Sequence, residues 1–252
     1  MAQPEHRPLR ELHSSPAQIP HRSTTRPPWR PRLIEGNPAI ARASVGAPPP
    51  KLLRRKRAFD IVFGVALIIF LAPLMLIIAA LVKLDGGPVL FGHRRVGANG
   101  QAFRCWKFRS MVVNADKVLA DVLRSDPDAR AQWQRDFKLK SDPRITPIGQ
   151  FLRTTSLDEL PQLFNVIAGD MSLIGPRPIV VEEIQRYGEA FRHYCACRPG
   201  MTGLWQVSGR NGVDYVRRVK FYEQYATGWS FLLDLTVLCR TVVVVTQRRG
   251  AY

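Results

Sequence analysis

The hydrophobic and polar positions of this chain divide it into regions of different character. Residues 1–50 are polar and rich in proline and arginine, whereas residues 61–82 are apolar and carry no charge. The first region has too few apolar residues to form a core and too many prolines for regular helix, which predicts a disordered tail. We therefore divide the chain into that tail, a basic flank with an apolar membrane segment (51–85), and a water-soluble domain on the cytoplasmic side (86–252).

The uncharged run at 61–82 is long enough to cross a bilayer, because about 20 apolar residues span the hydrocarbon core as a helix. Pro73 removes a backbone hydrogen bond near its middle. The two arms on either side are about 18 and 13 Å long at ~1.5 Å per residue. Each arm reaches roughly halfway through a core of about 30 Å. The pattern is compatible with a re-entrant helix and with a kinked spanning helix.

Basic residues stand at both ends of this run and bear on its topology. Residues 54–57 read Arg-Arg-Lys-Arg before it, and Lys83 and residues 93–95 (His-Arg-Arg) follow it. Lys and Arg favour the cytoplasmic side of a membrane, and each is attracted to anionic lipid by ~1 kcal/mol. Two basic flanks favour a segment that enters and leaves on the same, cytoplasmic side, as in a monotopic membrane protein.

Beyond residue 88 the pattern predicts an α+β fold that is mostly helical and contains a small β-hairpin. Asn99-Gly100 is a typical hairpin turn between strands expected over 89–96 and 102–111. Apolar residues at helical spacing predict helices over 113–137, from 157 onward and over 179–194.

The last apolar segment, residues 231–246, differs from the run at 61–82 because it contains Asp234 and Arg240. Charges inside an apolar helix argue against spanning. They favour a helix that packs on the domain or lies in the headgroup plane. We therefore expect a C-terminal interfacial helix.

The charge of the chain indicates an anionic partner. Its formal net charge is +17, and residues 1–57 alone hold 12 basic against 3 acidic residues. Nucleic acid, acidic lipid and phosphorylated substrates are the candidates. The apolar run favours membrane lipids and phosphates, whereas Trp106 between cations is the one indication of nucleic-acid binding, so no nucleic-acid partner is expected.

Two adjacent acidic residues stand in the segment TTSLDELPQLFNV (154–166). Asp158 and Glu159 lie at the start of an expected helix, with Pro161 in its first turn. One explanation is structural, since acids suit a helix N-terminus and Ser156 has capping-box spacing to Glu159. The other is functional, since adjacent carboxylates suit a Mg²⁺ that bridges substrate phosphates.

Basic residues in conformationally restricted settings favour the functional explanation. Strand alternation would place Lys107 and Arg109 on one face, and Arg177 lies between two prolines. Pre-positioned guanidinium groups match phosphate oxygens. The candidate cations for charge screening and nucleotide contacts are Lys107, Arg109, Arg144, Arg153 and Arg177.

At this level of detail the sequence resembles a known family, the bacterial sugar transferases or monotopic phosphoglycosyl transferases. The resemblance covers about residues 51–252. It rests on KRAFDIVFG, RRVGANGQAFRCWKFRSM, SDPRITPIGQFLRTTSLDELPQLFNV and CRPGMTGLWQVSGR, which follow one another in the family's order. The ending DLTVLCRTVVVVTQRRGAY is similar to members that start exopolysaccharide synthesis with a hexose phosphate, often galactose or glucose.

The resemblance implies an enzyme that transfers a sugar-1-phosphate from a UDP-sugar to undecaprenyl phosphate at the cytoplasmic face of the bacterial inner membrane. Asp158 matches the family's nucleophile, which forms an aspartyl-phosphosugar intermediate. Glu159 matches the partner that helps to place Mg²⁺, so both residues are the expected metal ligands.

The resemblance also implies a re-entrant helix–break–helix at Pro73, where Ala72 replaces the serine common in relatives. A non-catalytic scaffold of a polysaccharide assembly complex is the alternative function. The sequence leaves open which sugar is transferred and whether the chain forms a homo-oligomer.

Overall fold

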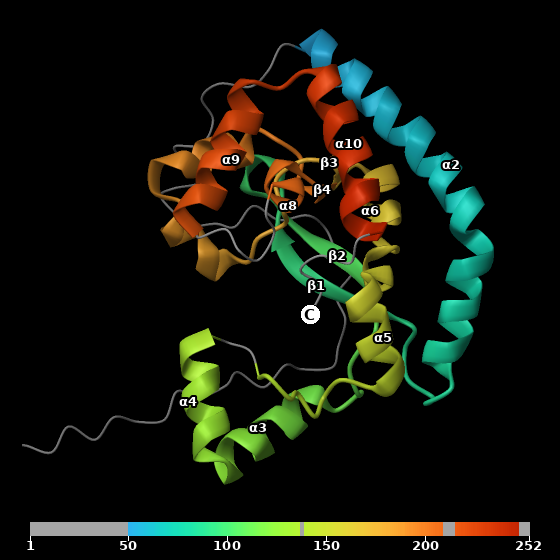
Figure 1. Ribbon diagram of the computed structural model, residues 1–252, viewed down its shortest axis with the longest axis vertical. Helices are drawn as coiled ribbons and strands as arrows, with labels where there is room; N and C mark the ends of the chain where they lie inside the picture. The colour runs from blue at the N-terminus through green and yellow to red at the C-terminus, as the bar shows by residue number, and fades with distance from the viewer. Residues whose placement is uncertain (1–49, 137–138, 209–214, 247–252) are drawn as a thin grey trace, which may run out of the picture. The chain divides into compact units, whose positions relative to one another are not determined.

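The computed structural model of the chain describes residues 50–136, 139–208 and 215–246, so the predicted tail lies outside the described residues except at its end (Figure 1). Most described residues are helical, as predicted. The longer helices are α2 (Pro50–Lys83), α3 (Ala115–Ser125), α4 (Pro127–Asp136), α5 (Pro147–Thr155), α6 (Gln162–Ala168), α9 (Tyr215–Thr227) and α10 (Phe231–Thr246). Shorter turns of helix are η1 (Ala98–Gly100), η2 (Leu157–Glu159), η3 (Val181–Arg186), η4 (Gly188–Ala190), α7 (Phe191–Cys195) and α8 (Leu204–Val207).

The predicted β-hairpin is confirmed. Strands β1 (Leu90–Val96) and β2 (Ala102–Phe108) pair antiparallel, with Leu90 opposite Phe108 and Val96 opposite Ala102. Asn99 and Gly100 both have positive φ, at 54° and 70°, which is why this dipeptide suits the turn. A second, parallel pair, β3 (Ser172–Ile174) with β4 (Gly200–Thr202), was not predicted. Three-residue strands are too short to show an alternating pattern.

The three helices expected over 113–137, from 157 onward and over 179–194 are all divided in the structure, and the one from 157 is η2 followed by α6. The helix expected over 113–137 is divided into α3 and α4. The Asp126 side chain accepts hydrogen bonds from the backbone N–H groups of Asp128 and Ala129, so it caps a new helix that begins at Pro127. The helix expected over 179–194 is the series η3, η4 and α7. The C-terminal segment is one helix, α10, as expected.

Helix α2 differs from its prediction because it runs without interruption through Pro73. The expected helix–break–helix is therefore not confirmed. Among the described residues, α2 is the one helix that is long and apolar enough to cross a membrane, by length and composition alone. Loss of one backbone bond at a proline bends a helix but does not have to end it.

Both halves of α2 pack against the same globular body, and Figure 1 shows the helix following a curved path beside α6 and α5. Phe59 and Leu67 pack on a hydrophobic cluster that includes Leu163 and Val166 of α6. Met75, Ile78 and Val82 form a second cluster with Phe108 and Leu152.

The opposite face of α2 is exposed and apolar. Val62, Ile69, Phe70 and Leu76 are each between 64% and 79% accessible. An exposed apolar surface of this extent marks a membrane-contact face. The geometry therefore associates the chain with a membrane along one side of α2, while the other side belongs to the core.

The start of α2 also caps the C-terminus of α6. Arg57 donates from its two terminal nitrogens to the carbonyl oxygens of Val166 and Ile167, at 2.5 and 2.7 Å. These carbonyls belong to the last turn of α6, which Gly169 ends with a positive φ of 92°. A cation at a helix C-terminus satisfies free carbonyls and complements the helix dipole.

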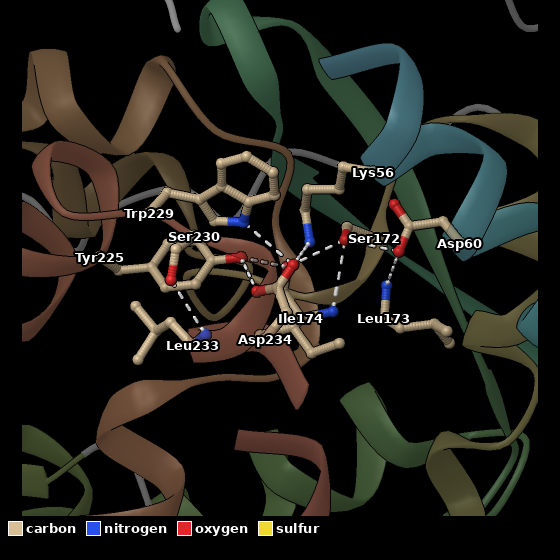
Figure 2. Close-up of polar contacts among 10 residues, drawn as sticks. All are labelled: Lys56, Asp60, Ser172, Leu173, Ile174, Tyr225, Trp229, Ser230, Leu233 and Asp234. Carbon is tan, nitrogen blue, oxygen red and sulfur yellow. Dashed lines mark hydrogen bonds and ion pairs between the residues drawn. The ribbon is translucent and has the colours of Figure 1, made fainter. Parts of the chain in front are cut away.

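A buried polar network joins α2 to α10, as Figure 2 shows. The Asp234 carboxylate is 1% exposed and accepts from Lys56 Nζ (2.6 Å), Tyr225 Oη (2.7 Å) and Trp229 Nε1 (3.0 Å). One turn along α2, Asp60 accepts from Ser172 Oγ and from the backbone N–H of Leu173 in β3. Asp234 thus connects α10 by hydrogen bonds to Lys56 of α2 and to Tyr225 of α9.

We expect Lys56→Met to destabilise the protein by ~3–5 kcal/mol, because it leaves the buried Asp234 carboxylate without its cation. The neighbouring change Arg55→Met removes the same charge from an exposed position and should cost less than about 0.5 kcal/mol. Thermal unfolding in detergent micelles measures both. Equal losses for the two variants would contradict the role of the Lys56–Asp234 pair.

Candidate active site

Lys107, Asp158 and Glu159 meet in the structure although about 50 residues separate the lysine from the acids. Lys107 Nζ donates to Asp158 Oδ2 at 3.0 Å and to Glu159 Oε1 at 2.6 Å. Lys107 lies near the end of β2, and the acids lie in η2, the corner between α5 and α6. Asp158 is 6% exposed, whereas the Glu159 side chain is 38% exposed. The site therefore has one buried and one accessible carboxylate on a shared cation.

The backbone of the corner explains why the acids point to Lys107 rather than cap a helix. Ser156 has a left-handed conformation (φ 59°, ψ 17°), ends α5, and makes no side-chain capping bond. The capping box suggested by the spacing of Ser156 and Glu159 is therefore not formed. Pro161 precedes α6, where its missing N–H leaves no intrahelical bond unmade.

The two carboxylates differ in ionisation. Burial raises the pKa of Asp158, and the neighbouring Glu159 raises it further, so that the opposing effects of Lys107 and Arg153 do not bring it back to its ordinary value. Burial acts on Glu159 in the same direction. For Glu159, however, Lys107, Arg177 and Arg95 together hold the pKa below its ordinary value.

Arg153 reaches the site because α5 packs tightly on the segment after β2. Its Nε donates to Ser110 Oγ at 3.0 Å. A side chain on Gly149, one turn earlier in α5, would place its Cβ 2.0 Å from the Ser110 carbonyl oxygen. The Thr146 hydroxyl caps the start of α5 by accepting from the Gly149 N–H. Only glycine permits this approach, which sets the position of Arg153.

Arg177 and Arg95 act electrostatically on Glu159 and help to lower its pKa. Arg177 stands in a loop whose base is fixed by the close backbone contact of Gly175 with Gly200, where a Cβ on Gly200 would lie 2.0 Å from Gly175 N. Burial lowers the pKa of Arg95, and the nearby Arg177 lowers it further. Two arginines held close together create a positive potential that an anionic ligand would relieve.

Arg95 was considered in the sequence only as part of the basic flank of the membrane segment. In the structure it lies in β1 opposite Phe103, so Arg95 and Lys107 belong to one face of the hairpin. The alternation of residues along β1 and β2 indicates which residues of each strand share a face. To see that Arg95 and Lys107 share the same face, the pairing register of the two strands is also needed, and the Asn99-Gly100 turn fixes that register.

Arg109 is engaged elsewhere. All five of its N–H donors are used, by the Asp85 carboxylate and by the carbonyl oxygens of Val82, Pro88 and Met111. It does not continue the alternation from Lys107 because β2 ends at the residue before it. These contacts are all made within the protein, and a substrate contact for Arg109 stays a prediction.

Arg144 is also paired within the protein. Its Nε and a terminal nitrogen donate to the two oxygens of Asp142 at 2.8 and 2.7 Å, and its guanidinium lies 5.1 Å from the ring centre of Trp133. Burial disfavours the charged form of Asp142, but Arg144 outweighs it and lowers the carboxyl pKa, with a further contribution from Arg153. A substrate contact for Arg144 stays a prediction.

No cluster of three or more His, Cys, Asp or Glu side chains suited to a metal occurs in the part of the chain that the structure describes. The adjacent oxygens of Asp158 and Glu159 are the donor type that Mg²⁺ prefers. Mg²⁺ commonly takes one or two protein carboxylates and completes its shell with water and substrate phosphates. The pair therefore fits such an ion.

These features define a membrane-associated protein with a carboxylate pair set among cations, a site suited to phosphate chemistry. The chain matches the pattern of the family described as "Bacterial sugar transferase" over residues 52–248, and it belongs to that family. The resemblance drawn from its motifs is confirmed.

Among its relatives is an undecaprenyl-phosphate galactose phosphotransferase of Salmonella typhimurium, 55% identical over 197 residues, which are 78% of this chain and 41% of the relative. An uncharacterized sugar transferase of Haemophilus influenzae is 56% identical over 78% of this chain and 42% of its own length. The exopolysaccharide production protein ExoY of Sinorhizobium fredii is 48% identical over 78% and 88%. The chain thus spans about two-fifths of the length of some relatives and most of another.

The Arg109–Asp85 pair gives a pH-dependent contribution to stability. Hydrogen bonds from Arg109 and from the Gly87 N–H lower the pKa of Asp85 in the folded protein. The contribution is therefore present above the ordinary carboxyl pKa of about 3.9 and is lost as the pH falls through the lower, folded value. Asp85→Asn should lower the unfolding temperature at pH 7, and its deficit relative to wild type should shrink towards pH 3.

Thermal unfolding across this pH range measures that deficit. Asp121→Asn is the control, because its exposed partner Arg124 lies 3.5 Å away on the same helix and such pairs contribute little. A deficit for Asp85→Asn that stays constant with pH would contradict the assignment.

Proposed function

We propose that the chain transfers a sugar-1-phosphate from a UDP-sugar to undecaprenyl phosphate, the first membrane step of exopolysaccharide synthesis. The observation that carries the proposal is the buried Asp158 carboxylate, held by Lys107 beside Glu159 and influenced by three arginines. The names of the relatives point to the same acceptor class.

In the proposed mechanism an Asp158 oxygen attacks the sugar-bearing phosphorus of the donor. The phosphorus–oxygen bond to UMP breaks, and UMP leaves with the electron pair. A phosphate oxygen of the lipid then attacks the same phosphorus, and the Asp158 carboxylate leaves. A carboxylate needs no general base, but it must approach an anionic diphosphate, so its charge has to be screened.

The cations of the site supply that screening. Lys107 already neutralises part of the charge of both carboxylates. Arg153 acts on the Asp158 side, and Arg177 with Arg95 on the Glu159 side, where each suits a phosphate oxygen of the donor. Asp158 and Glu159 would hold Mg²⁺, which supplies further neutralisation of phosphate charge when it is bound.

We also propose that α2 is monotopic and enters the membrane from the cytoplasmic side of the bacterial inner membrane. Its two halves pack on the same globular body, which a helix crossing the bilayer could not do with both ends. Lys83 and the exposed Arg54 and Arg55 place positive charge at both ends. A bend at Pro73, where one backbone hydrogen bond is missing, would allow a shallow re-entrant path.

Purified protein with Mg²⁺ and undecaprenyl phosphate should release UMP from one member of a panel of UDP-sugars. Asp158→Asn should reduce release below detection, because an amide is a poor nucleophile towards phosphorus. Asp116→Asn, an exposed acid-to-amide change in α3, should leave the rate unchanged. Intact-mass spectrometry of wild type with donor alone should detect a sugar-phosphate adduct that Asp158→Asn lacks.

Full turnover by Asp158→Asn would reject Asp158 as the nucleophile. A wild-type protein that releases no UMP from any donor, although folded, would reject the enzymatic proposal in favour of a scaffold.

The monotopic proposal predicts that both ends of α2 are accessible from the cytoplasm only. Single cysteines at Arg55 and at Leu84, which is 82% exposed, can be introduced in a Cys239→Ser background because Cys239 is the exposed native thiol. A membrane-impermeant maleimide should label both sites after the inner membrane is permeabilised and neither in intact spheroplasts. Labelling of one site in intact spheroplasts would mean that α2 spans.

A further inference from the structure

Asn165 is a buried polar residue that the proposed mechanism does not use. It lies in the middle of α6 and is 1% exposed. A buried amide is costly unless its hydrogen bonds are made. The side chain of Asn165 makes three such bonds, and two of them go to the strand that carries Lys107.

The Asn165 amide binds β2 as a neighbouring strand would. Its Oδ1 accepts from the Trp106 N–H at 2.9 Å, and its Nδ2 donates to the Arg104 carbonyl oxygen at 2.7 Å. Backbone groups two residues apart point to the same edge of a strand. Because β1 pairs along the other edge, one amide occupies the uncovered edge of β2 at this point.

The third bond fixes the orientation of the amide. Nδ2 also donates to Asp170 Oδ2 at 3.1 Å, so the nitrogen has two acceptors and the oxygen one donor. The backbone carbonyl of Asn165 meanwhile accepts from the N–H groups of Gly169 and Asp170, which ends α6. The backbone of Asn165 is thereby fixed by the turn that ends α6, while its side chain is fixed by β2 and Asp170.

This contact joins the two parts of the candidate active site. Trp106 directly precedes Lys107, and α6 begins three residues after Glu159. Apart from the contact of Lys107 itself, the Asn165 amide is a direct polar link between β2 and the helix that follows the acids. Its loss would allow the strand to slide or tilt relative to η2.

We propose that Asn165 is a positioning residue, which holds Lys107 at the correct distance from Asp158 and Glu159 for the transfer reaction. This inference rests on the function proposed above. Asparagine suits the role because it is short enough to stay on the helix and has both a donor and an acceptor. Aspartate would keep the acceptor but lose the donor to Arg104, and alanine would lose both.

The test compares Asn165→Ala with Tyr225→Phe in the complete chain, using UMP release and thermal unfolding. Tyr225→Phe removes a buried hydroxyl that lies within hydrogen-bond distance of the Ile174 carbonyl oxygen and of Asp234 Oδ1, neither of which belongs to β2 or η2. For Asn165→Ala we expect kcat to fall about 10- to 100-fold, because small misplacements of reacting groups have such effects. The KM for the donor should change less than about threefold, because the arginines that act on the phosphates do not lie on α6.

A double-mutant cycle shows whether Asn165 acts through Lys107. If it does, Asn165→Ala should slow the Lys107→Met variant only about twofold, far less than it slows wild type. Tyr225→Phe should leave kcat unchanged at a similar loss of unfolding temperature. If Asn165→Ala does not fold, Asn165→Ser, which is too short to bridge Trp106 and Arg104, replaces it in the cycle.

Three outcomes would overturn the inference while leaving the proposed function intact: an unchanged kcat for Asn165→Ala, full additivity with Lys107→Met, or an equal loss of kcat for Tyr225→Phe. A wild-type protein without transferase activity would instead overturn the proposed function, and the positioning role with it. Wild-type turnover in the same assay therefore separates the two failures.

Discussion

The hydrogen bonds from Lys107 to Asp158 and Glu159 are the interaction on which the arrangement of the site depends. Adjacent carboxylates, one of them buried, repel each other and resist ionisation unless a cation is held against both. The hairpin supplies that cation, and the corner between α5 and α6 supplies the acids. The tight approach of Gly149 to Ser110 serves to keep hairpin and corner in contact.

The membrane helix belongs to the same assembly as the site. Its first half completes the hydrophobic cluster around α6, and its second half completes the cluster beneath the end of β2. The polar network around Asp234 ties the start of α2 to α10. In the proposed monotopic arrangement, the packing of α2 on the core would therefore constrain the depth at which the carboxylate pair lies relative to the membrane.

Much of this could be predicted from the sequence where a local rule decides the outcome. Asn99-Gly100 predicted the hairpin because the turn requires residues that accept positive φ. Asp158 and Glu159 were recognised as candidate site residues because conformationally restricted cations accompany them in the sequence. Where long-range contacts decide, the local sequence pattern alone does not define the outcome. Arg109 is paired with Asp85, which lies 24 residues earlier in the chain. Helix α2 continues through Pro73 because both of its halves pack on the core. The role of Asn165 is seen only once β2 is known to lie beside it.

The contact of Arg57 with the end of α6 has a consequence for how the protein can be handled. Deleting all residues before the hairpin to obtain a soluble fragment would remove more than an apolar membrane anchor. It would take away the cap of α6, the partner of Asp234 and one wall of two hydrophobic clusters. A better-behaved preparation would keep α2 whole and replace only its lipid-facing side chains by polar ones.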